Sequence, residues 1–193
     1  MAFTVPSPRL PLDGTVQWYE TGLGWATAIG PPLQLLTGSR FDVLELPADA
    51  GLALLRRVPR TGPVALTGRR MQLLVAAGGA EELPGLLDWL EWGGIALDLT
   101  AIGAHGRIDA PAPPGPGGAQ GAACWLRPPE PGREVEPDLP VFSGVGQRGG
   151  APDLVRLVDV AATECHRARM VRRAAAFRGA PPGRQRNQPL AFS

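Results

Sequence analysis

Lysine is absent from this chain of 193 residues, and all 19 cationic side chains other than histidine are arginine. Glycine and proline are abundant, at 26 and 22 residues, and alanine is frequent. This combination is typical of high-GC coding, as in actinobacteria, so arginine in place of lysine says little by itself about phosphate recognition. Because glycine and proline are concentrated in a few stretches, we expect loops around a compact core.

Cysteine, histidine and long apolar runs are scarce. The two cysteines, Cys124 and Cys165, show no CxxC spacing, and with only two histidines the sequence argues against a Cys/His zinc site. No stretch reaches the roughly 18 apolar residues of a membrane span. The N-terminal stretch MAFTVPSPRLPLDG lacks the charged and then apolar pattern of a signal peptide. We therefore expect a cytoplasmic protein with reduced thiols and no membrane partner.

Acidic residues are absent after Glu164. Residues 1–166 hold 12 arginines and all 18 acids, a balance of −6, whereas residues 167–193 hold seven arginines, a balance of +7. The chain therefore has an acidic body and a basic tail. The tail is a candidate for binding nucleic-acid phosphates or an acidic protein partner. A solvated, frayed helix end is one alternative interpretation, and attraction of the tail to the acidic body of the same chain is another. The candidate tail residues are Arg167, Arg169, Arg172, Arg173 and Arg178.

Hydrophobic periodicity predicts an α/β chain of the α+β type, with a mixed central sheet, flanking helices and a long C-terminal helix. The expected strands are 25–29, 33–36, 40–46, 62–68, 69–77, 95–102 and 122–126. The expected helices are 14–21, capped by Asp13, then 48–57, 80–92 and 153–177. A single domain is expected over 13–177, between a flexible arm (1–12) and a disordered arginine-rich tail (178–193), with Pro/Gly-rich loops at 109–121 and 128–150.

The strand at 40–46 is the stretch around which the other elements are organised. By strand alternation, one face carries Phe41, Val43 and Glu45, and the other carries Asp42, Leu44 and Leu46. Each face therefore has apolar residues and a carboxylate, as for an inner strand covered on both sides. Asp98 is a further acid, placed inside the strand expected at 95–102. A carboxylate within a sheet is costly unless paired, and Arg40 and Arg70 are the expected partners.

Several motifs resemble those of a known family. They are Gly24-Trp25, the segment DVLELPADAG (42–51), the segment GRRMQLLV (68–75), Asp98 in IALDL, and Cys124-Trp125-Leu126-Arg127-Pro128-Pro129. Together they resemble the primase–polymerase domain of bacterial bifunctional DNA primase/polymerase proteins, in the archaeo-eukaryotic primase superfamily, over roughly residues 15–130. The resemblance implies two-metal phosphoryl transfer, in which strand carboxylates at i and i+2 and a later acid hold Mg or Mn.

The departures from that pattern are at the metal positions. Glu45 matches the first acid, but Pro47 occupies the position of the second. Asp49 can reach back only from the start of the following helix, and Asp98 would be the later acid. Met71 and Gln72 stand where the family has a histidine. The resemblance therefore implies a catalytically degenerate copy, with no cofactor and with Mg or Mn required only if catalysis survives.

The turn at Thr67–Arg70 offers a second kind of site. Arg69 and Arg70 can fork onto the oxygens of a nucleotide phosphate, and Gln72 can donate a hydrogen bond to one. A solvated turn is the alternative interpretation for the two arginines. For the carboxylates at 42, 45 and 98, the alternative to metal binding is an ordinary polar residue at a strand end or sheet face.

Three functions remain open from the sequence. The first is a catalytically inactive primase–polymerase-like protein that binds nucleic acid or a nucleotide in a regulatory role. The second is a protein–protein interaction or scaffold module that uses the acidic body and the basic tail. The third is an active metal-dependent nucleotidyltransferase in which Glu45, Asp49 and Asp98 form a rearranged metal set.

Overall fold

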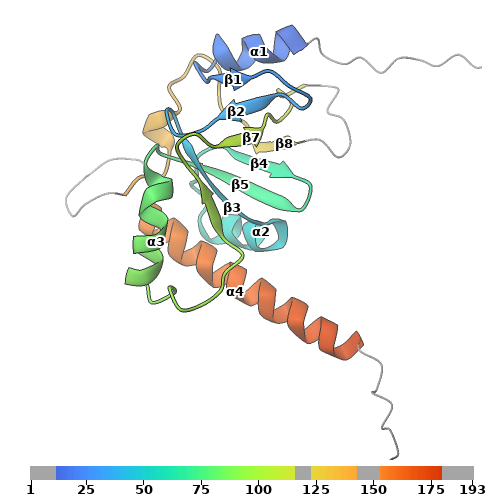
Figure 1. Ribbon diagram of the computed structural model, residues 1–193, viewed down its shortest axis with the longest axis vertical. Coiled ribbons are helices and arrows are strands. Elements are labelled where there is room, and N and C mark those ends of the chain that lie inside the picture. The colour runs from blue at the N-terminus through green and yellow to red at the C-terminus, as the bar shows by residue number, and fades with distance from the viewer. Residues whose placement is uncertain (1–11, 116–122, 143–152, 180–193) are drawn as a thin grey trace, which may run out of the picture.

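The computed structural model describes residues 12–115, 123–142 and 153–179, and it places them in two sheets covered by helices (Figure 1). The small sheet has the strand order β1-β2-β7, and the large sheet has the order β6-β3-β5-β4-β8. Every neighbouring pair in these sheets is antiparallel.

The helices are α1 (Leu12–Glu20), α2 (Ala48–Arg57), α3 (Gly79–Trp89) and α4 (Leu154–Gly179), with a short 3-10 helix η1 (Glu136–Asp138). The strands are β1 (Thr27–Ala28), β2 (Gln34–Leu36), β3 (Asp42–Pro47), β4 (Val64–Thr67), β5 (Arg70–Val75), β6 (Thr100–Ile102), β7 (Arg107–Asp109) and β8 (Cys124–Arg127). None of the helices described is both long and apolar enough to cross a bilayer.

Two hydrophobic clusters lie on the two faces of the large sheet. Leu44 and Leu46 of β3 point toward α2, α3 and α4, where the buried members include Leu54, Leu83, Leu157 and Val158. Val43, on the opposite face, packs beneath α1 and the small sheet, where the buried members include Tyr19, Trp25, Leu35 and Phe41. β3 is therefore an inner strand that is covered on both sides.

The predicted α+β class and long C-terminal helix are confirmed, although the central sheet expected to be mixed pairs only in antiparallel fashion. Asp13 lies inside α1 and not at its N-cap. In α2 the buried residues are Ala50, Gly51 and Leu54, while Leu52 is exposed. The sequence did not predict β7, which pairs with β2.

Asp98 lies outside the strand predicted at 95–102, because β6 begins only at Thr100. Glu45 pairs with Thr100 across β3 and β6, so continuing the register would set Asp98 opposite Pro47. Pro47 has no N–H to donate across this ladder, and the pairing ends at Glu45 and Thr100, two residues earlier. Without a hydrogen bond from Pro47 to continue the ladder, Asp98 lies in a loop beside the end of the sheet.

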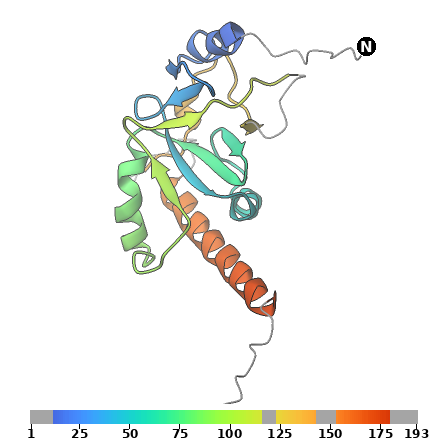
Figure 2. The ribbon, with the colours of Figure 1, turned by 45° about the vertical axis from the view of Figure 1, so that its right-hand side comes forward.

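The ends of the chain differ from the prediction in one respect. α4 extends through Gly179, so Arg178 is helical where a disordered tail was expected from residue 178. Residues 1–11 of the expected arm and 180–193 of the expected tail lie outside the described residues. Figures 1 and 2 both show the last turns of α4 extending past the body formed by the sheets.

Candidate functional site: an arginine–carboxylate cluster at the end of the sheet

The site lies where β3 passes into α2, and Pro47 is its centre. Pro47 pairs with Arg70 of β5 on one side, and the loop that carries Asp98 lies on its other side. Pro47 is also the N-cap of α2, where it provides no side-chain hydrogen bond. The positive end of the α2 dipole is directed at this end of the sheet, and Asp49 in the first turn accepts a hydrogen bond from the Ala50 N–H at 2.9 Å.

Arg70 joins two carboxylates across the end of the sheet. Its Nε donates to Glu45 Oε1 at 3.0 Å, and its Nη1 donates to Asp98 Oδ1 at 2.6 Å. Partial burial disfavours the charged guanidinium, but the hydrogen bonds to Asp98 and Glu45 outweigh this effect and raise the pKa of Arg70. The guanidinium thus takes the central place that a cation would have among these acids.

Arg172 of α4 closes the cluster from the other side of the site. Its Nη1 donates to Asp49 Oδ2 at 2.9 Å, and its Nη2 lies 3.9 Å from Asp98 Oδ2. These pairs are half-exposed, so each contributes at most about 1 kcal/mol to stability. Their main effect is to hold Arg172 at the mouth of the site.

Gln72 fixes the remaining carboxylate oxygen of Glu45. Gln72 is buried directly opposite Glu45 in the β3–β5 register. Its Nε2 donates to Glu45 Oε2 at 2.9 Å, and its Oε1 accepts a hydrogen bond from Thr67 Oγ1 at 3.4 Å. The side chain is therefore used inside the cluster, and the phosphate-binding role expected for Gln72 has no support from its contacts.

A cavity of about 480 Å³ opens beside these groups. Its wall consists of Pro47, Ala48, Asp49, Leu52, Gly68, Arg69, Arg70, Asp98 and Arg172. Three arginines from two segments of the chain thus line the cavity with two carboxylates, and the first turn of α2 adds the positive end of a helix dipole. The exposed Leu52 of α2 forms part of this wall.

The three candidate catalytic acids are thus gathered at one end of the sheet, as partners of arginines. Glu45 is bound by Arg70, Asp49 by Arg172, and Asp98 by both. Within 12–115, 123–142 and 153–179, no group of three or more His, Cys, Asp or Glu side chains is arranged to hold a metal ion. The predicted pairing of Glu45 and Asp98 with Arg70 is confirmed, whereas Arg40 pairs with Glu136 instead.

The five tail arginines have different surroundings. Arg167 pairs with the buried Glu164 at 2.8 Å, and Arg169 donates to the Ala96 carbonyl. Arg173 and Arg178 are exposed on the projecting end of α4. Only Arg172 reaches the cavity, a role that sequence reasoning missed because its partner Asp49 is 123 residues away in the chain. The charge asymmetry between body and tail was the one available signal.

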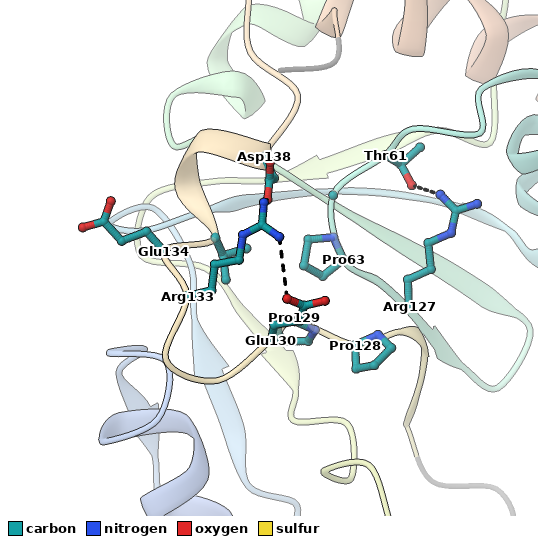
Figure 3. Close-up of a pocket in the computed structure, with 11 residues that line it drawn as sticks. Thr61, Pro63, Arg127, Pro128, Pro129, Glu130, Arg133, Glu134 and Asp138 are labelled. Carbon is teal, nitrogen blue, oxygen red and sulfur yellow. Dashed lines mark hydrogen bonds and ion pairs between the residues drawn. The ribbon is translucent and has the colours of Figure 1, made fainter. Parts of the chain in front are cut away.

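A second cavity, of about 220 Å³, lies on a different part of the molecule, between the 61–63 loop and the segment after β8 (Figure 3). Pro63, Pro128 and Pro129 form much of its wall. Arg127 donates to the Pro59 carbonyl at 2.7 Å and to Thr61 Oγ1 at 2.8 Å, so its guanidinium is held by the wall. None of the candidate acids or tail arginines lines this cavity.

Comparisons with protein-family models, with curated proteins and with solved structures returned no match for this chain.

Proposed function

We propose that this chain is a primase–polymerase-like protein that binds the phosphates of nucleic acid or a nucleotide, without transferring them, in a regulatory role. The observation that carries the proposal is the cluster of ion pairs around Pro47. The acids that would hold metals, Glu45, Asp49 and Asp98, each bind an arginine. A guanidinium can donate two parallel hydrogen bonds to a phosphate. Beside a carboxylate, it also competes with a divalent cation for that carboxylate.

Phosphate binding is supported by the composition of the larger cavity. Arg69, Arg70 and Arg172 come from the β4–β5 turn, from β5 and from α4, and all three line one wall. The α2 N-terminus supplies a further positive potential at the same point. Asp49 and Asp98 hold two of the arginines in place, and an incoming phosphate would compete with them for the same N–H groups.

Binding is tested by fluorescence anisotropy with labelled single-stranded and duplex DNA over a salt series. The informative variant is Arg69→Ala, because Arg69 is exposed and lines the cavity. We expect weaker binding and a salt dependence reduced by about one unit of slope, the signature of one lost phosphate contact. Arg60→Ala is the matched control, since Arg60 is also exposed, in the loop before β4, and lies outside the cavity wall.

Catalysis is tested separately, by nucleotide incorporation on a primed template with Mg or Mn. We expect no incorporation by the wild-type protein. Incorporation that Glu45→Gln and Asp98→Asn both remove would show that the acids still serve a metal-dependent reaction, and would overturn the non-catalytic part of the proposal. Absence of binding to every DNA probe at low salt would overturn the binding part.

A further inference from the structure

The last part of α4 is exposed and contacts the body through Arg172, which pairs with Asp49. The inner half is anchored by buried residues, which are Leu154, Leu157, Val158, Ala161, Ala162 and Cys165. Residues 170–178 are all exposed, and at 1.5 Å per residue they form a helical arm about 14 Å long. Figures 1 and 2 show this arm leaving the body at an oblique angle. We call residues 170–178 the α4 arm.

The side of the α4 arm that faces away from the body is apolar and narrow. Met170, Ala174 and Phe177 are spaced i, i+4 and i+7, so they share one side of the helix. Cys165 and Arg172, seven residues apart, lie on the opposite side and contact the body. Met170 and Phe177 are 51% and 86% exposed, so a partner that covered this side would remove their apolar surface from water.

Arginines border the apolar side on both flanks. Arg173 lies on one flank, while Arg178 and the preceding Arg167 lie on the other, by the 3.6-residue helical repeat. No acid occurs between residue 165 and the end of the sequence. The partner must therefore carry negative charge on both sides of a surface that accepts apolar groups. A second copy of the α4 arm does not meet this need, because it would bring arginines against arginines.

We propose that the α4 arm enters the major groove of a B-form DNA duplex, an inference that rests on the proposed function. The groove is about 12 Å wide and accepts a helix between two rows of phosphates. The consecutive Ala174, Ala175 and Ala176 keep the arm thin at its middle, while the arginines of the two flanks reach the phosphates of the two strands. Met170 and Phe177 then contact base edges such as thymine methyl groups.

Binding in the major groove predicts a preference for duplex DNA over other nucleic acids, which charge attraction alone does not predict. The major groove of A-form RNA is too narrow and deep for side chains to read, so double-stranded RNA should bind less tightly. Single-stranded DNA carries phosphates but has no groove. We expect a labelled DNA duplex to bind about tenfold more tightly than either probe of the same sequence at the same salt.

Two variants with the same chemical change test the groove directly. Ala174→Phe thickens the outward side of the α4 arm, whereas Ala176→Phe adds the same group nearly opposite, and neither alters the charge. We expect Ala174→Phe to weaken duplex binding about tenfold and to leave single-strand binding unchanged, while Ala176→Phe changes neither. Far-UV circular dichroism verifies that both variants keep the helix.

Three results would overturn the inference, and they differ from failure of the proposed function. One is an equal effect of the two variants on duplex binding. Another is tight binding without a preference for duplex DNA, which would leave the proposed function intact. The third is a dimer by light scattering that Ala174→Phe dissociates, because the outward side would then belong to a second copy. If the wild-type protein binds no nucleic acid at all, both proposals fail together.

Discussion

Asp42 is the residue whose observed role differs most from the role expected from the sequence. Its side chain is fully buried at the start of β3 on the face toward the helices. Oδ2 accepts hydrogen bonds from the N–H groups of Gly78, at 2.8 Å, and Ala80, at 3.0 Å. Gly78 is the N-cap of α3, at φ 89°, and has no side chain with which to cap it. Asp42 therefore caps a helix from a neighbouring strand.

This position raises the pKa of Asp42. Burial is the largest cause, and the nearby carboxylate of Glu81 adds to it, while the hydrogen bonds from Ala80 and Gly78 act in the opposite direction. A carboxyl group whose pKa is higher in the folded state makes its full contribution to stability at low pH. That contribution is lost as the pH rises through the pKa of the folded protein.

Asp42→Asn separates this effect from the rest of the pH dependence. The asparagine can still accept a hydrogen bond at the α3 N-terminus, but it has no charge to bury. We expect the free energy of unfolding of the wild type to fall relative to the variant as the pH rises above about 4, the ordinary pKa of an aspartate. Urea titrations of both proteins across that range give the difference. A difference that is constant with pH, or that grows in favour of the wild type, contradicts the assignment.

At the scale of the element, α2 shows how closely a helix can approach the sheet. Gly51 is buried in α2, and a Cβ at this position would lie 2.3 Å from Met71 Sδ and 2.9 Å from Met71 Cβ. Gly85 is also inside a helix, α3, but a Cβ there would have no neighbour within 4 Å. The two glycines therefore differ in packing and not in helical position.

The same substitution should have opposite effects at these two sites. Alanine is favoured over glycine in a helix by about 1 kcal/mol, so Gly85→Ala should stabilise the protein by up to this amount. At Gly51 an overpacking cost of roughly 1–3 kcal/mol opposes that gain, so Gly51→Ala should destabilise it by about 1 kcal/mol. Chemical denaturation of the two variants measures both. A stabilised Gly51→Ala variant would mean that Met71 repacks freely.

Sequence patterns predicted elements well where local signals agree. The expected helix at 48–57 matches α2 residue for residue, because Pro47 defines its start and the loop from Val58 to Pro63 follows its end. The strand at 95–102 was predicted too long, since the limit on β6 comes from Pro47 of a different strand. Hydrophobic alternation contains no information about the N–H groups of the partner strand.

The candidate site was predictable in its parts and not in its assembly. Glu45, Asp49 and Asp98 were identified from the motif pattern, and Arg70 from its position beside them. The position of Arg172 depends on how α4 crosses the end of the sheet, which no local pattern determines. Arg172 pairs Asp49 and Asp98 with a guanidinium, as Arg70 does for Glu45 and Asp98.

At the scale of the whole molecule, the residues that anchor α4 to the body and the arginines that give it positive charge lie in successive parts of the chain. The buried residues of α4 end at Cys165, so its apolar anchor precedes the arginine-rich part. Beyond Arg169, the ion pairs of Arg172 with Asp49 and Asp98 are the polar contacts that the described part of α4 makes with the body. Ending the chain after Arg169 would remove five arginines and no acid, which takes the formal net charge from +1 to −4.

This truncation should separate folding from binding. The ion pairs of Arg172 are half-exposed, so their loss should lower the free energy of unfolding by only about 1 kcal/mol. We expect a folded protein, by near-UV circular dichroism of its buried tryptophan, whose affinity for DNA at low salt falls by about two orders of magnitude or more. Full-length protein carrying Arg172→Ala alone is the control, and it should lose far less affinity. If the truncated protein keeps the full salt-dependent affinity, the phosphates bind to the body and the α4 arm has another role.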